Sequence, residues 1–225
     1  MTDIAVIVAH PDDEVLAFGG LMARQSSRGD VIHVLIMATG LSSRTDNVHL
    51  DQDELKKLRA DCLSANEILG VKNVKFENFP DNRMDSIALL DVIKPVERFL
   101  AETAATQVYT HHLGDLNIDH RVVAMAVATA TRTLPGNNFD RVCSGEVLSS
   151  SEFSFQENRF VPNAYADISG FVELKCQAMD SYKSEIRRWP HPRSLEAIRA
   201  AAALRGSEAG FEAAEALNVV RDIYR

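Results

Sequence analysis

Two short stretches, far apart in the chain, combine histidine with several carboxylates. The first is AHPDDE at 9–14, which directly follows an apolar run, and the second is HHLGDLNIDHR at 111–121. Histidine and aspartate supply the nitrogen and oxygen ligands of a catalytic zinc, which keeps its fourth position open for water. Taken together, the two stretches offer His10, Asp13 and His120 as candidate ligands of one metal ion.

A metal held this way would set a specific chemistry. Bound water can have its pKa lowered to about 7, which makes hydroxide available at neutral pH. Asp12, next to the ligands but not one of them, is then the candidate general base. Such a site would hydrolyse an amide, an ester or a phosphoester. The competing interpretation is a strand-to-helix turn in which Asp12 or Asp13 caps a helix, but capping needs one carboxylate and no histidine.

The elements around these stretches alternate between strands and helices. Short apolar runs predict strands at 4–9, 31–38, 73–78 and 106–110, and helical spacing predicts helices at 14–28, 51–69, 86–103 and 119–132. This alternation predicts an α/β fold with a Rossmann-like, doubly wound, mostly parallel sheet. In the strand order 3-2-1-4, the first and fourth strands are neighbours at the topological switch point, where ligands bind. The two histidine–carboxylate stretches would meet there.

The remaining part of the chain has a different pattern. Strands are predicted at 142–148, 153–155, 164–168 and 216–224, and helices at 169–182, capped by Ser169, and at 195–205. Long linkers and repeats are absent from the sequence. We therefore expect a single domain over 1–225, in which 1–135 form the βαβ core and 136–225 pack over the site.

Composition narrows the protein class. The net charge of −8 over 225 residues argues against a nucleic-acid surface. The apolar runs are far shorter than the roughly 20 residues needed to cross a bilayer, and the first strand begins too early to leave room for a signal peptide. Cys62, Cys143 and Cys176 form no C-x-x-C pair and are expected to be free thiols in a reducing compartment. We expect a cytoplasmic protein without stable membrane insertion.

The first stretch, with a later Asp-His pair, resembles the LmbE-like (PIG-L) family of zinc-dependent N-deacetylases. These enzymes act mostly on sugars of the N-acetylglucosamine type in glycoconjugates. Further matches are TGLSSR at 39–44, FPD at 79–81, the second stretch, and the tail PHPRS at 190–194 with RG at 205–206. The resemblance implies that His10, Asp13 and His120 hold one zinc, with other divalent ions possible, and that Asp12 is the base. It also makes a homo-oligomer credible.

The same resemblance suggests substrate contacts. Asp81 and Arg59 match positions that bind or orient substrate in family members. The family's second motif often reads His-x-x-His, and its first histidine is replaced here by Asn117, which donates a hydrogen bond but carries no charge. Asn117, His111 or His112 could assist at the carbonyl oxygen, and Asn117 is favoured because it is in register. The candidate substrate contacts are Arg44, which lies on a strand-end loop, together with Arg59, Asp81, His111 and His191.

Two other functions remain open at this point. A metal-dependent phosphoesterase would use the same ligands, but such enzymes commonly hold two metals, and the sequence offers firm ligands for one. A non-catalytic sugar-binding module is disfavoured because Asp12 is retained. The sequence contains none of the motifs G-x-G-x-x-G, P-loop and G-x-S-x-G, so it gives no support to nucleotide-cofactor or serine-hydrolase chemistry.

Overall fold

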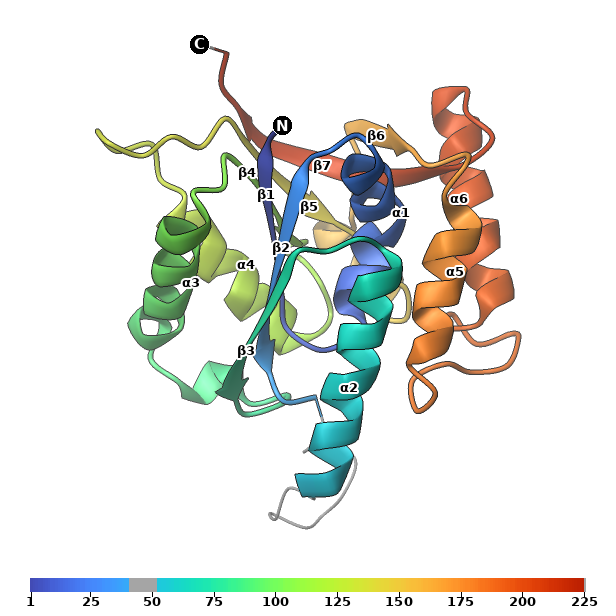
Figure 1. Cartoon of the computed structure of the whole chain (residues 1–225), viewed down its shortest axis with the longest axis horizontal. Helices are drawn as coiled ribbons and strands as arrows, with labels where there is room; N and C mark the ends of the chain where they lie inside the picture. The colour runs from blue at the N-terminus through green and yellow to red at the C-terminus, as the bar shows by residue number, and fades with distance from the viewer. Residues whose placement is uncertain (41–51, 225) are drawn as a thin grey trace.

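The computed structural model describes residues 1–40 and 52–224, and a sheet in the order β3-β2-β1-β4-β5-β7-β6 runs through its centre (Figure 1). Neighbours from β3 to β5 pair in parallel, whereas β7 is antiparallel to both β5 and β6. The predicted doubly wound fold and the order 3-2-1-4 are confirmed. The strands are β1 (Asp3–Val8), β2 (Val31–Ala38), β3 (Asn73–Phe79), β4 (Gln107–His111), β5 (Arg141–Gly145), β6 (Ala164–Asp167) and β7 (Ala214–Asp222).

Helices cover both faces of the sheet (Figure 1). One layer holds α3 (Leu89–Thr103) and α4 (Ile118–Ala130); the other holds α1 (Asp13–Ser27), α2 (Gln52–Ile68), α5 (Val172–Ser181) and α6 (Leu195–Ala209). Alternate residues of β1 pack against the two helix layers. One face of the strand packs with α1 and α2 through Ile4, Val6 and Val8. The other face packs with α3 and α4 through Ala5 and Ile7. Burial on both faces explains why the strand reads as a continuous apolar run. Within the described residues, no helix is both long and apolar enough to span a membrane.

Three predicted elements differ from the structure. The strand expected at 153–155 is wrong. Phe153 ends a 3₁₀ turn, η3 (Ser151–Phe153), and the hydroxyls of Ser151 and Ser154 bond to the loop after β4. The strand expected at 142–148 ends at Gly145. Ser169 does not cap α5, because its hydroxyl bonds to Asp167 at the end of β6. The described residues also contain the short turns η2 (Met84–Ser86) and η4 (Gln156–Asn158).

The C-terminal part is tied directly to α1. Glu215 on β7 accepts hydrogen bonds from the backbone N–H groups of Gly20 and Leu21, at 2.8 and 2.7 Å, and pairs with Lys175 Nζ at 2.6 Å. Gly20 is required here, because a Cβ atom would lie 2.7 Å from the Ile168 side chain. The glycine pair in α1 therefore permits close packing of the protein against itself. This packing fixes α1, the helix that begins within the AHPDDE stretch at 9–14.

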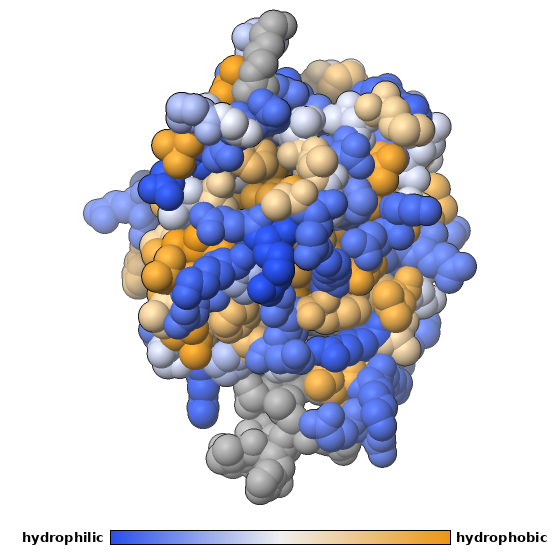
Figure 2. Space-filling view, turned by 60° about the vertical axis from the view of Figure 1, so that its left-hand side comes forward, coloured by the Kyte–Doolittle hydropathy of each residue, from blue (hydrophilic) through white to orange (hydrophobic). Residues whose placement is uncertain are grey.

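The outer surface is mixed in character. On the face in Figure 2, hydrophobic side chains occur in separate groups on either side of a hydrophilic band. Scattered apolar side chains of this kind are normal for a protein surface. The large apolar clusters lie instead between the sheet and its two helix layers.

Candidate active site

The two histidine–carboxylate stretches, 9–14 and 111–121, meet at the carboxyl ends of β1 and β4. These strands are paired neighbours, with Ile7 opposite Thr110. The chain leaves β1 through 9–12 and β4 through 112–117, and the rings of His10 and His120 come to lie with centroids 5.4 Å apart. An open cavity of about 420 Å³ lies over them. The two stretches thus meet at the switch point between β1 and β4, as predicted.

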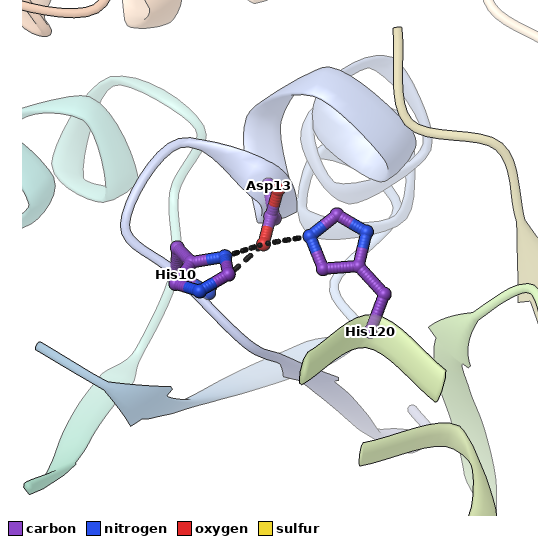
Figure 3. A group of neighbouring side chains, drawn as sticks. All are labelled: His10, Asp13 and His120. Atoms are coloured by element: carbon purple, nitrogen blue, oxygen red, sulfur yellow. Dashed lines mark hydrogen bonds and ion pairs between the residues drawn. The ribbon is translucent and has the colours of Figure 1, made fainter. Parts of the chain in front are cut away.

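One carboxylate oxygen lies between the two imidazoles (Figure 3). Asp13 Oδ2 is 3.2 Å from His10 Nδ1 and 3.2 Å from His120 Nε2. The opposite ring nitrogens also face carboxylates: His10 Nε2 is 3.0 Å from Asp119 Oδ2, and His120 Nδ1 is 3.1 Å from Asp115 Oδ1. A carboxylate on the far nitrogen fixes the ring and its tautomer, as it does for metal-bound histidines. In their neutral form, both imidazoles would therefore direct a lone pair toward Asp13.

The electrostatics of this cluster fit a cation. Burial lowers the pKa of His120, but the carboxylates of Asp13 and Asp115 outweigh it and raise this pKa to about 9. Burial is likewise outweighed at His10, whose pKa is raised by hydrogen bonds to Asp119, Asp13 and Asp81. The cluster thus attracts protons onto both rings. A divalent ion would replace those protons and supply the same positive charge, and His10, Asp13 and His120 each offer a ligand atom within 4.8 Å of the others.

A second group, His10 with Asp81 and Asp119, is equally compact. Asp81 Oδ1 lies 3.1 Å from His10 Nε2. The Asp119 carboxylate, however, already accepts backbone N–H groups from Asn82 at 2.6 Å and Met84 at 2.9 Å. Its position therefore serves to orient His10 and to anchor the loop after β3. Asp81 also lines the cavity, and its contact with substrate stays a prediction.

Asp12 occupies an unusual backbone conformation, with φ at 109°. Such a conformation is costly outside glycine and persists only when the surroundings enforce it. Glu14 does so, because its Oε2 accepts the Asp12 backbone N–H at 3.0 Å. Asp12 stands at the N-cap position of α1, yet its side chain makes no capping hydrogen bond. The capping interpretation is thus not supported, and the carboxylate is left for the cavity, where burial raises its pKa more than Arg193 lowers it.

Glu14 links this turn to two other elements. The side chain is fully buried, and its Oε1 accepts hydrogen bonds from Asn66 Nδ2 on α2, at 2.9 Å, and from the Tyr182 hydroxyl after α5. Burial raises the pKa of this carboxyl to about 7. Glu14, which closes the AHPDDE motif, therefore supports the turn, a role that the motif alone does not reveal.

Asn117 holds its amide in a defined orientation. It is the N-cap of α4, and its Oδ1 accepts the Asp119 backbone N–H at 2.8 Å. Its Nδ2 donates to Asn82 Oδ1 at 3.2 Å. Because an amide nitrogen carries two hydrogens, one remains for the cavity that Asn117 lines.

Several expected substrate contacts lie elsewhere. His111 is wholly buried, stacks on His120 at 3.9 Å and accepts the Ala9 N–H at 2.7 Å, so it supports the site from behind. Burial lowers the pKa of His111 to about 3, which keeps the ring neutral. Arg59 donates to Asn78 on the outer surface, and His191 accepts the Arg193 N–H within an exposed turn. None of these three is among the described residues that line the cavity. Arg44 lies outside the described residues.

The structure also brings in residues that the sequence analysis did not assign. Arg193, after α5, places Nη1 3.1 Å from Asp12 Oδ2 and 3.0 Å from Glu185 Oε2. Asp115 accepts hydrogen bonds from the hydroxyls of Ser150 and Ser151, which tie the loop after β5 to His120. The signal for Arg193 was its place in the PHPRS tail. The serines carry no sequence pattern that marks them.

Comparisons with known proteins identify the family and the fold of the chain. Residues 5–131 match the family model PIG-L, described as GlcNAc-PI de-N-acetylase. The chain is 34% identical over 137 residues to the uncharacterized deacetylase YaiS of Escherichia coli K12, covering 59% of this chain and 69% of that protein. The fold is shared with N,N'-diacetylchitobiose deacetylase from Pyrococcus horikoshii (TM-score 0.78, 19% identity, 97% and 84% covered). It is shared too with GalB, the 4-carboxy-2-hydroxymuconate hydratase of Pseudomonas putida KT2440 (TM-score 0.77, 20% identity, 100% and 98% covered). The chain belongs to the PIG-L (LmbE-like) deacetylase family.

Proposed function

We propose that this protein is a zinc-dependent N-deacetylase that removes the acetyl group from an N-acetylated amino sugar in a glycoconjugate. The observation that carries the proposal is the convergence of His10 Nδ1 and His120 Nε2 on Asp13, with the separate carboxylate of Asp12 in the same cavity. Membership of a deacetylase family supports the reaction class. The P. horikoshii protein of the same fold is named for an acetylated sugar, which supports the substrate class.

The set of His10, Asp13 and His120 suits zinc, because three nitrogen and oxygen ligands leave one position open. An ion bound there would polarise the acyl carbonyl and lower the pKa of water to about 7. The carboxylates of Asp119 and Asp115 hold the two imidazoles in the ligating tautomer.

The chain's own groups then move the proton. Asp12 accepts a proton from the attacking water and later gives it to the sugar nitrogen, so that the C–N bond breaks and acetate and a free amine leave. The cavity hydrogen of Asn117 Nδ2 donates to the carbonyl oxygen as negative charge develops on it. Asn117 is suited to this role because its oxygen is already held by the start of α4.

The cavity lining favours a hydroxyl-rich substrate. Amide, hydroxyl and carboxylate groups of Asn82, Ser149, Ser150 and Glu185 line it. Arg193 is the only arginine or lysine among the described lining residues, and it already faces the carboxylates of Asp12 and Glu185. A phosphorylated or polycarboxylate substrate would therefore meet repulsion from the lining. This argues against a phosphoesterase and against the hydration chemistry of GalB.

A substrate panel tests the function. Free, nucleotide-linked and lipid-linked N-acetyl sugars are incubated with zinc-loaded protein, and acetate release is measured. We expect release from at least one sugar and loss of release after chelation. Phosphate esters and unsaturated polycarboxylates should remain unchanged. Acetate release that is insensitive to chelation, or turnover of the phosphate esters alone, would refute the proposal.

Variants assign the roles within the same assay. Asp12→Ala should keep zinc and lose about 10²- to 10⁴-fold in turnover, as expected for a missing acid–base group. Asp13→Ala and His120→Ala should lose the metal as well. Asp91→Ala, in an exposed pair with Lys94 on α3, is the control. Normal zinc content in His120→Ala would overturn the ligand assignment.

The cellular setting remains a proposal too. The three cysteines are buried and unpaired, which supports a reducing compartment such as the cytoplasm. The predicted absence of nucleic-acid partners and the credible homo-oligomer stay predictions.

A further inference from the structure

We propose that Arg193 is a positioning residue that holds the Asp12 carboxylate toward the reacting water, and that Glu185 and Ser149 hold Arg193 in turn. This inference rests on the proposed function, in which Asp12 is the base. It explains why the PHPRS segment at 190–194 reaches the site.

The guanidinium group of Arg193 contacts three side chains. Its Nη1 lies 3.1 Å from Asp12 Oδ2 and 3.0 Å from Glu185 Oε2, and its Nε donates to Ser149 Oγ at 2.8 Å. Both carboxylate side chains are nearly inaccessible, at 4% and 3% exposure, whereas Arg193 is 31% exposed. One guanidinium group thus connects the turn after β1, the loop after β5 and the segment after α5.

The backbone that carries Arg193 is also anchored. The next residue, Ser194, is fully buried and caps α6, because its Oγ accepts the Ala197 N–H at 3.1 Å. On the other side, the Arg193 carbonyl accepts the Arg187 N–H at 3.3 Å. The guanidinium group therefore starts from a fixed Cα position.

The consequence for Asp12 is orientation. A short carboxylate on a turn can rotate about χ1, and only some rotamers direct an oxygen toward the metal ligands. Arg193 engages Oδ2, which restricts that rotation and leaves Oδ1 for the water proton. Misplacement of a reacting group by about 1 Å can cost roughly 100-fold in rate. A lysine cannot replace this arrangement fully, because a single ammonium lacks the planar fork that meets several acceptors at once.

The test compares zinc-loaded wild type with Arg193→Ala, Arg193→Lys and the control Arg199→Ala on α6, which breaks an exposed pair with Glu173 of α5. Zinc content, kcat and KM are measured on the sugar that the wild type turns over. We expect Arg193→Ala to keep its zinc and its KM and to lose about 100-fold in kcat. Guanidinium ion at a non-denaturing concentration should restore part of that loss in Arg193→Ala only. Arg193→Lys should be intermediate, and Arg199→Ala should match the wild type.

A crystal structure of zinc-loaded Arg193→Ala tests the positioning role without any substrate. We expect the Asp12 carboxylate to leave its wild-type rotamer while the ligand side chains stay in place. If the wild type is inactive on every sugar, the proposed function fails, but this crystal structure still decides the role of Arg193. An unchanged Asp12 rotamer, an unchanged kcat, or a rise in KM alone would overturn the positioning role. If Arg193→Ala fails to fold, the Asp12 rotamer and the kcat of Arg193→Lys provide the same test.

Discussion

At the scale of single residues, hydrogen bonds and ion pairs with neighbouring side chains hold the polar groups of the site in place. His10 and His120 each direct one ring nitrogen toward Asp13 and the other toward a second carboxylate. Asp12 makes no capping bond, and its Oδ2 lies 3.1 Å from Arg193 Nη1. Each of these side chains has a neighbour that fixes its orientation, as a preorganised site requires.

Asn117 allows a test at this scale. Asn117→Asp keeps an oxygen for the α4 cap but removes the N–H that we assign to the carbonyl oxygen. We expect kcat to fall by about 100-fold, the usual cost of one lost oxyanion donor, with KM and zinc content little changed. Steady-state kinetics on zinc-loaded protein measures this, with circular dichroism as the control for helix content. Wild-type kcat in Asn117→Asp would remove the residue from the mechanism.

At the scale of elements, buried polar contacts hold the start of α1 where the chemistry needs it. Glu14 connects the turn after β1 to α2 and to the segment after α5. Further along α1, Glu215 on β7 binds two backbone N–H groups and pairs with Lys175 of α5. The C-terminal part therefore supports the turn that carries His10 and Asp12 through the helix that follows it.

The Lys175–Glu215 pair predicts a stability effect without a metal effect. Removing one partner leaves a buried carboxylate without its counter-charge, which typically costs about 3–5 kcal/mol. We expect Lys175→Met to lower the free energy of unfolding by this amount and to leave the zinc content of folded protein unchanged. Lys94→Met, in an exposed pair with Asp91, should change it by less than about 1 kcal/mol. Chemical denaturation of both variants provides the measurement, and equal effects would contradict the assignment.

At the scale of the whole molecule, periodicity and topology predicted most of the architecture. The buried runs of β1 and β2 and the alternation with helices indicated a doubly wound sheet. The order 3-2-1-4, taken from folds of that type, then predicted the meeting of His10 with His120. These features depend on local burial and on the handedness of βαβ units, which sequence patterns reflect.

What the sequence did not reveal depends on long-range contacts. The contact of Arg193 with Asp12 joins residues 181 positions apart, and no periodicity reports it. The position of His111 in the sequence suggested a substrate contact. In the structure, its Nε2 accepts the Ala9 backbone N–H behind His120. The segment 153–155 has strand-like composition, yet the neighbouring serines bond to the loop after β4. Tertiary hydrogen bonds outweighed local propensity there.

The proposed chemistry requires a single metal position shared by the loops after β1 and β4. Anomalous diffraction at the zinc edge from zinc-soaked crystals locates that position directly. We predict one peak per chain, about 2.0–2.2 Å from His10 Nδ1, Asp13 Oδ2 and His120 Nε2. A peak among His10, Asp81 and Asp119 instead, or no peak between residues 10 and 120, would contradict it.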